Sequence, residues 1–265
     1  MIKITTIETK SYKLCMGINH ELKSRCTINW GDGVISLISN LNQATHKYKK
    51  KGVYEIVVTN LDTSIFTFEN DQLVRRIEGV LPFLPDKGIA RMFSHAINLE
   101  YVDPEFFSLN DHQTDATALC FGCERLKSVE FLKKLRNLEN INYFLCGTQS
   151  TIDLSPIYNY DWAAKVRYAC GAFSNRKYIS EPDENVLSRM EKLEVADFVF
   201  SNIEHMNVCR NYFVNNLELK SINGAFRGCN IREIDPNWLY YLPSSVETKV
   251  EDIFDENFKC KLNGR

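Results

Sequence analysis

No stretch of this sequence approaches the ~20 consecutive apolar residues that a membrane-spanning helix needs. The first residues, MIKITTIETKSYK, also lack the apolar core and the small-residue cleavage site of a secretory signal. These absences argue against membrane insertion and against signal-dependent secretion. We therefore expect a chain that is made in the cytoplasm and that reaches an outer surface by incorporation into a virion or another particle.

A basic excess is missing as well. The chain carries 32 Lys and Arg against 34 Asp and Glu, a net charge of -2, which argues against general electrostatic binding to nucleic acid. One local basic cluster is interpreted as a solvated loop or strand edge rather than as a binding patch. It consists of Lys47, Lys49, Lys50 and Lys51.

Motifs of catalysis are also absent. The sequence contains no G-x-S-x-G, no H-E-x-x-H and no phosphate-binding glycine loop, and its 5 histidines are scattered. Among its 9 cysteines, the C-x-x-C formed by Cys120 and Cys123 has no second pair at zinc spacing. Reduced, buried thiols are the simpler interpretation. We expect a protein that is not an enzyme and uses no cofactor and no metal; an enzyme with an unrecognised site is the alternative.

Short β-prone runs separated by turn signals are typical of a β-sandwich, and they fill roughly the first seventy residues. The clearest runs are residues 3–7, 24–30 and 52–59. Trp30 is a candidate core residue at a strand end, and Gly31 and Gly33 permit turn conformations that a side chain resists. Asp32 between them can accept hydrogen bonds from backbone amides of the turn.

The same stretch resembles the polycystic kidney disease (PKD) domain family. The resemblance rests on a W-G-D-G turn, a following H-x-Y and a later G-x-Y strand, formed here by Trp30, Gly31, Asp32, Gly33, His46, Tyr48, Gly52 and Tyr54. It implies a PKD/Ig-like sandwich over residues 1–72 in which these residues are structural, with both tyrosines in the core. Domains of this family act as spacers or interaction modules.

From about residue 74 onward, an apolar or small residue recurs at every third position in groups of four. The groups are Phe93, Ala96, Leu99 and Val102; Cys120, Cys123, Leu126 and Val129; Leu132, Leu135, Leu138 and Ile141; Leu187, Met190, Leu193 and Ala196; and Phe213, Asn216, Leu219 and Ile222. Steps of 12 or 13 residues between groups are typical of a solenoid, whose small units bury one continuous apolar face. The Phe-x-x-Cys part predicts one helical turn, and the Leu-x-x-Val part predicts a short extended segment.

These units resemble BspA-like leucine-rich repeats, and the copies Gly171-Ala172-Phe173 and Gly224-Ala225-Phe226 are close to the A-F-x-x-C pattern of that family. The resemblance implies a short, irregular array over residues 73–240 with insertions at residues 103–117 and 150–168. Apolar residues between Val246 and Phe258 have helical spacing, so residues 241–265 are predicted to form a C-terminal helical cap. The predicted fold class is α+β: a PKD/Ig-like β-sandwich, a short irregular leucine-rich-repeat solenoid and a helical cap.

Recognition is the function that this architecture favours, because loops on a rigid scaffold commonly carry binding residues. Two aromatic clusters are candidate binding residues, and an equally good interpretation places each of them in the core or the cap. The clusters are Tyr158, Tyr160 and Trp162, and Trp238, Tyr240 and Tyr241. We expect contacts with a protein partner or a large assembly, such as a phage tail or head decoration. Carbohydrate binding by a surface adhesin is the alternative.

Overall fold

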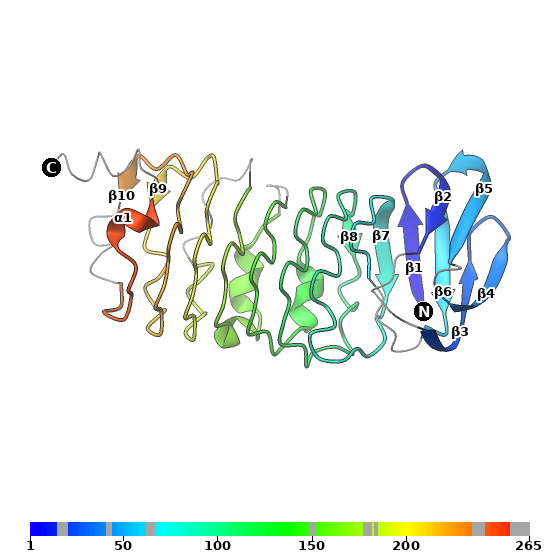
Figure 1. The fold of residues 1–265 in the computed structure, drawn as a ribbon, viewed down its shortest axis with the longest axis horizontal. Coiled ribbons are helices and arrows are strands. Elements are labelled where there is room, and N and C mark those ends of the chain that lie inside the picture. The colour runs from blue at the N-terminus through cyan, green and yellow to red at the C-terminus, as the bar shows by residue number, and fades with distance from the viewer. Residues whose placement is uncertain are drawn as a thin grey trace.

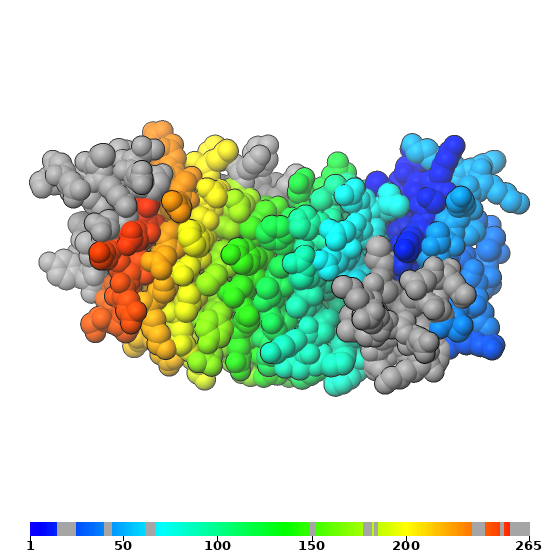
Figure 2. Space-filling model, in the orientation of Figure 1, coloured from blue at the N-terminus to red at the C-terminus, as the bar shows by residue number. Residues whose placement is uncertain are grey.

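The computed structural model describes residues 1–14, 21–40, 44–61, 67–148, 152–176, 182, 185–234 and 242–254. The molecule is elongated, with a strand-rich N-terminal end and a long stack of turns that ends at the C-terminal segment (Figure 1). Figure 2 shows that successive segments lie side by side along the long axis. From β7 (Val74–Gly79) onward, position along this axis therefore follows position in the sequence.

A six-stranded sheet forms the N-terminal end, in the order β4-β3-β6-β1-β7-β8. All neighbouring strands are antiparallel except β7 and β8. The strands are β1 (Ile2–Thr6), β3 (Glu21–Asn29), β4 (Ile35–Asn40), β6 (Glu55–Thr59), β7 (Val74–Gly79) and β8 (Tyr101–Val102). A separate antiparallel pair consists of β2 (Thr9–Lys13) and β5 (Thr45–Gly52). Since β7 pairs with β1, the sheet crosses residue 72, where a domain boundary is predicted.

Alternating burial explains why these segments form strands. In β1 the side chains of Ile2, Ile4 and Thr6 are buried, and those between them are half-buried. In β6 the side chains of Ile56 and Val58 are buried in the same alternating way. β-branched residues suit a pleated surface of this kind, so local preference and packing agree.

Beyond β7, the chain forms turns that stack through parallel backbone hydrogen bonds. One row of single β-bridges joins Asp115, Asn140, Tyr168, Val195 and Ser221 in succession. Short parallel strands pair at β7–β8 and again at β9 (Val208–Cys209) and β10 (Glu233–Ile234). In the described part of the stack, 3-10 helices lie within the turns at η2 (Glu130–Lys134), η3 (Ser155–Asn159) and η4 (Ala163–Lys165).

Two residues in each turn have a left-handed backbone conformation. Ala118 and Gly122 have φ of 52° and 68°, and the side chain of Cys120 between them is buried. Neighbouring turns repeat this arrangement at the pairs Arg91 and His95, Tyr143 and Gly147, Gly171 and Asn175, Phe198 and Asn202, and Gly224 and Gly228. Corresponding residues are 25 to 28 positions apart, so one physical turn spans about two of the units that are visible in the sequence.

A single apolar core runs from the N-terminal sheet to the end of the stack. Phe200 packs between Phe173 and Phe226, with ring centroids 6.2 and 5.9 Å apart. Phe254 extends the row at 5.7 Å from Phe226. Each of these turns therefore buries a side chain by packing it against the turns on both sides, because no turn encloses a core of its own.

The predicted fold class is wrong. The described residues form mainly strands and turns, with three short 3-10 helices and one four-residue α-helix, α1 (Val250–Ile253). They form neither an α+β fold nor a leucine-rich-repeat solenoid with a helical cap. The Phe-x-x-Cys segments are not helical because their amides bond to the next turn: the Ala118 amide donates to the Asn142 carbonyl, and the Cys120 amide to that of Phe144.

The C-terminal segment departs from prediction for the same reason. The Gly224 amide donates to the Asp252 carbonyl, and the Phe226 amide donates to the Ile253 carbonyl. Backbone groups of this segment thus extend the stack, and the helix is limited to α1. The remainder of the predicted helix, residues 255–258, lies outside the described part of the chain.

Candidate functional site

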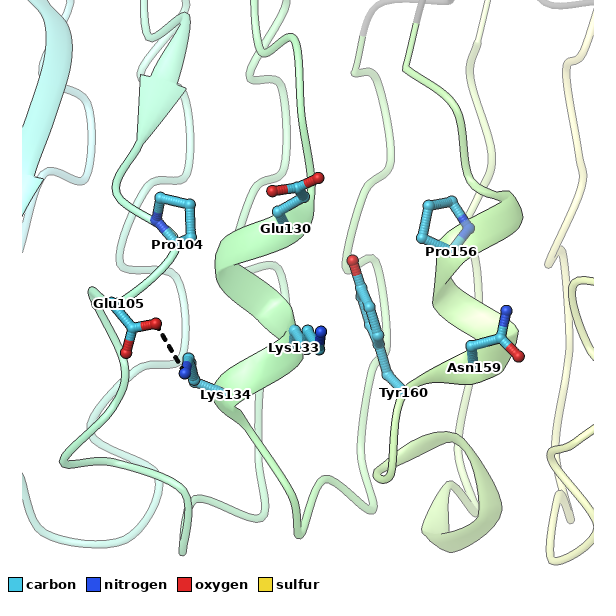
Figure 3. A pocket seen from close by; sticks show the side chains of 8 residues that line it. All are labelled: Pro104, Glu105, Glu130, Lys133, Lys134, Pro156, Asn159 and Tyr160. Carbon is cyan, nitrogen blue, oxygen red and sulfur yellow. Dashed lines mark ion pairs between the residues drawn. The ribbon is translucent and has the colours of Figure 1, made fainter.

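An open hollow of about 480 Å³ lies beside η2 and η3 in the middle of the stack (Figure 3). Three successive turns contribute to its wall. The lining residues are Pro104, Glu105, Glu130, Lys133, Lys134, Pro156, Asn159 and Tyr160. The hollow is therefore formed by stacking and is not present in any one turn.

Local sequence places the two short helices at its sides. Residues Phe131 and Leu132 of η2 are buried, and this leaves the flanking Glu130 and Lys133 exposed. On η3, Pro156 occupies the first turn, where proline's fixed φ favours a helix start, and Ile157 is the buried anchor. Each helix thus presents its polar residues to the hollow, together with Pro156 of η3, and its other apolar residues to the core.

Tyr160 stands between η2 and η3 (Figure 3). Only 5% of its surface is exposed, and its hydroxyl donates a long hydrogen bond of 3.5 Å to the Val129 carbonyl. Burial raises the pKa of Tyr160 to about 12, and the charges of Glu130 and Asp153 add to the rise. The phenol is therefore neutral near neutral pH, and because its proton is donated to Val129, its oxygen remains as a hydrogen-bond acceptor.

Charges of both signs surround this phenol. The Lys134 ammonium forms an ion pair with Glu105 at 2.7 Å. Glu130 and Lys133 are exposed, and neither has an ion-pair partner among the described residues. The hollow can therefore form new ion pairs with a group of either sign, and its two prolines and Asn159 provide uncharged surface.

Elsewhere on the stack, rows of charged residues neutralise one another across the turns. Glu194 accepts hydrogen bonds from Arg167 and Lys220, with the Lys220 ammonium at 2.7 Å. These contacts lower the pKa of Glu194, the bond from Lys220 having the largest effect. Glu100 pairs in the same way with Lys127. Such pairs stabilise the stack by joining neighbouring turns, whereas Glu130 and Lys133 have no ion pair among the described residues.

The predicted aromatic binding residues are only partly available. Tyr158 lies on η3 and is half-buried, but Tyr160 and Trp162 are buried. The Trp162 indole donates a hydrogen bond of 3.1 Å to the Leu132 carbonyl, so it supports η2 from the interior. The other predicted cluster, Trp238, Tyr240 and Tyr241, lies outside the described residues.

The residues of the W-G-D-G motif come together at the N-terminal end. Trp30 is buried, and its ring stacks on His46 at 5.1 Å between centroids. His46 is 2.8 Å from Asp32, whose pKa is lowered mainly by that contact. The Tyr48 hydroxyl donates to the Trp30 carbonyl, and the ring of Tyr48 stacks on half-buried Tyr54.

The glycines of this motif differ in whether a side chain would fit at their positions. Gly31 has φ of 83°, and a β-carbon there would lie 2.5 Å from the Glu55 carbonyl oxygen. Gly33 has φ of 91° with open space around it, and Gly52 lies against the Tyr54 ring. The turn therefore requires glycine at position 31 for space as well as for conformation. These contacts hold the turn against the strands around it.

Sequence reasoning missed the hollow because its lining comes from three separate segments. The signal that could have revealed it is a period of 26 residues, which relates Pro104 to Glu130 and Glu130 to Pro156. The 12- and 13-residue steps describe half of that period and do not align these positions. Both predicted insertions, residues 103–117 and 150–168, contribute to the lining.

The described residues contain no cluster of three or more His, Cys, Asp or Glu that could hold a metal ion. They also contain no helix that is long and apolar enough to cross a membrane. Comparisons with protein-family models, with curated proteins and with solved structures found no match. The resemblances to PKD domains and to BspA-like repeats therefore stay predictions.

Proposed function

We propose that this protein is a recognition module that binds a protein partner at the hollow and so takes part in an assembly. The observation that supports this function is the unpaired charge of Lys133 and Glu130 beside the neutral phenol of Tyr160. Backbone hydrogen bonds between the turns fix the backbone that carries these groups, so a partner would have to order the side chains alone.

The chemistry of the lining suits a protein better than a small molecule. Small-molecule sites are mostly apolar and enclose their ligand, but half of the lining residues here are charged and the hollow is open. Complementary charges on a protein surface would pair with both Lys133 and Glu130, which fixes orientation and speeds association. An assembly in a virion or a similar particle is the setting that we propose for such a contact.

Glycan binding has weaker support. Sugars stack on exposed faces of aromatic rings, and the rings of Tyr160 and Trp162 are buried. Tyr158 is the remaining described member of the predicted aromatic cluster, and it is half-buried. Within this cluster a single partly covered ring offers a small platform for a sugar, so we favour a protein partner.

Charge reversal in the hollow tests the proposal. Partners are recovered from the native source with the full chain as bait and identified by mass spectrometry. We expect a partner that binds in fixed stoichiometry, that is lost with Lys133→Glu and that is retained with Lys192→Glu. Lys192 is an exposed lysine outside the lining, so the control makes the same change in net charge. Equal binding by both variants would show that the hollow is not the contact.

A further inference from the structure

Strand β4 is an edge strand, and its outer edge has no neighbouring strand among the described residues. In the described residues β4 pairs with β3 alone, and it ends the six-stranded sheet at the end of the molecule farthest from the C-terminal segment (Figure 1). An edge of this kind presents unpaired backbone N–H and C=O groups that a further strand can bond.

Apolar side chains are exposed along this edge. Ile35 is 65% exposed, Leu37 is 59% exposed and Val34, directly before the strand, is 43% exposed. Ile35 and Leu37 are two residues apart and so lie on one face of the strand. The strand sequence, ISLISN, contains no charged residue and no proline, which are the usual protections of an edge.

The other sheet of the same end is protected. Strand β5 has the sequence THKYKKKG, and its Lys47, Lys49 and Lys50 are exposed. Two copies of β5 placed side by side would bring like charges together, which opposes pairing. The lysines of the basic cluster thus oppose pairing of β5 with another strand edge, and β4 carries no lysine.

We propose that β4 pairs antiparallel with β4 of a second copy of this chain, around a two-fold axis at Ser36. A two-fold interface uses the same surface on both subunits, so the strand must be complementary to itself. Pairing centred on Ser36 sets Ile35 opposite Leu37 of the second copy on the outer face. On the inner face it sets Val34 opposite Ile38, and apolar residues therefore meet on both faces.

Other registers are less favourable. An axis at Leu37 would set Leu37 opposite its own copy, but it would set Ile35 opposite Ser39 and Ser36 opposite Ile38. Ile35 and Ile38 would then each face a hydroxyl. A shift by one residue would also exchange the two faces of the incoming strand. At the flank, the Ser36 register sets Asp32 opposite uncharged Asn40, so no like charges meet. The regular pairing with β3 runs from Ile35 to Ile38, which covers the apolar residues of the contact apart from Val34.

Sedimentation of the full chain over a range of concentrations tests this dimer. We expect the wild type to dimerise and Leu37→Lys to weaken the dimer by at least about tenfold, because the charge enters both symmetric contacts. Ile35→Lys is expected to act in the same way. Leu217→Lys is the matched control, since Leu217 is 74% exposed and lies in the stack. All three positions are exposed, so the variants should fold.

A disulfide tests the register. Residues opposite each other on antiparallel strands have Cα atoms about 4.5–5.5 Å apart, within the range that a disulfide spans. Ser36→Cys is therefore expected to link two copies under oxidation, and Leu37→Cys is not. A wild type that stays monomeric, a dimer that withstands both lysine variants, or linkage through Leu37→Cys in place of Ser36→Cys would overturn the proposal. Lys133→Glu should leave the dimer unchanged, which separates this inference from the proposed function.

Discussion

Replacement of Trp162 separates a structural role from a binding role. Its side chain is fully buried, packs edge-on against Phe144 and donates to the Leu132 carbonyl. Truncation of a buried tryptophan to alanine costs about 3–5 kcal/mol of the free energy of unfolding. A typical domain has about 5–15 kcal/mol in total, so Trp162→Ala should remove a large share of the stability.

Trp162→Phe gives a graded test of the same contact. The variant keeps most of the apolar ring but loses the indole N–H. The Leu132 carbonyl also accepts the Leu135 amide at 3.2 Å, so it keeps one partner after the substitution. We therefore expect the free energy of unfolding to fall by an amount near the lower end of the range of about 1–3 kcal/mol that an unsatisfied buried polar group costs.

Equilibrium urea unfolding followed by circular dichroism measures both changes. Tyr158→Ala is the control in the same cluster, and we expect it to cost about 1 kcal/mol or less because the side chain is half-buried. An unfolding free energy of Trp162→Ala within about 1 kcal/mol of the wild type would refute the packing argument. Loss of partner binding in Trp162→Ala alone would reflect disruption of η2 and would not identify a binding residue.

Three further outcomes follow from the stack. Gly147→Ala should lower the free energy of unfolding by about 1–2 kcal/mol because φ of Gly147 is 70°. Gly224→Ala should lower it more, because its β-carbon would lie 2.4 Å from the Phe198 ring. Equal losses of stability in thermal melts of the two variants would contradict this contact. Contacts with Lys220 and Arg167 lower the pKa of Glu194 below 4.5, so the stability it contributes is present above pH 4.5 and is lost as pH falls through the lowered value. Glu194→Gln should therefore flatten the acid side of a melting-temperature profile, and an unchanged slope would argue against the ion pairs. Among the described cysteines, the buried thiols of Cys120, Cys123 and Cys146 should react with a thiol reagent only after denaturation, and peptide mapping would show any that react earlier.

The apolar pattern of the sequence identified buried positions but not their conformation. Phe93, Ala96 and Leu99 are all fully buried, as the three-residue spacing indicates. The same spacing suits one helical turn, which is why the prediction for these segments was wrong. What decides the conformation is the partner of each backbone amide, and the Phe93 amide bonds to Leu119, 26 residues away. Contacts of this range are not encoded in local periodicity.

The residues with positive φ also show that local sequence does not determine the backbone conformation. Gly122 and Gly147 are residue types that favour positive φ, and their conformation could have been proposed from sequence. Tyr143 and Phe198 also have positive φ, which is rare for bulky residues and is held by the turns on either side. The candidate site depends on the same long-range order, because Glu105 and Lys134 meet only when two turns are in register.

The column of left-handed residues also explains where glycine is needed. The Tyr143 ring lies 2.7 Å from where a β-carbon of Gly171 would stand, and the Phe198 ring lies 2.4 Å from that of Gly224. Each aromatic side chain thus occupies the space that the glycine of the following turn leaves open. At these positions, about 27 residues apart, a large side chain in one turn is therefore followed in the next turn by glycine, which has no side chain. The alternation is specific to the column that contains Tyr143, Gly171, Phe198 and Gly224, because a β-carbon at either glycine would overlap the aromatic ring of the preceding turn.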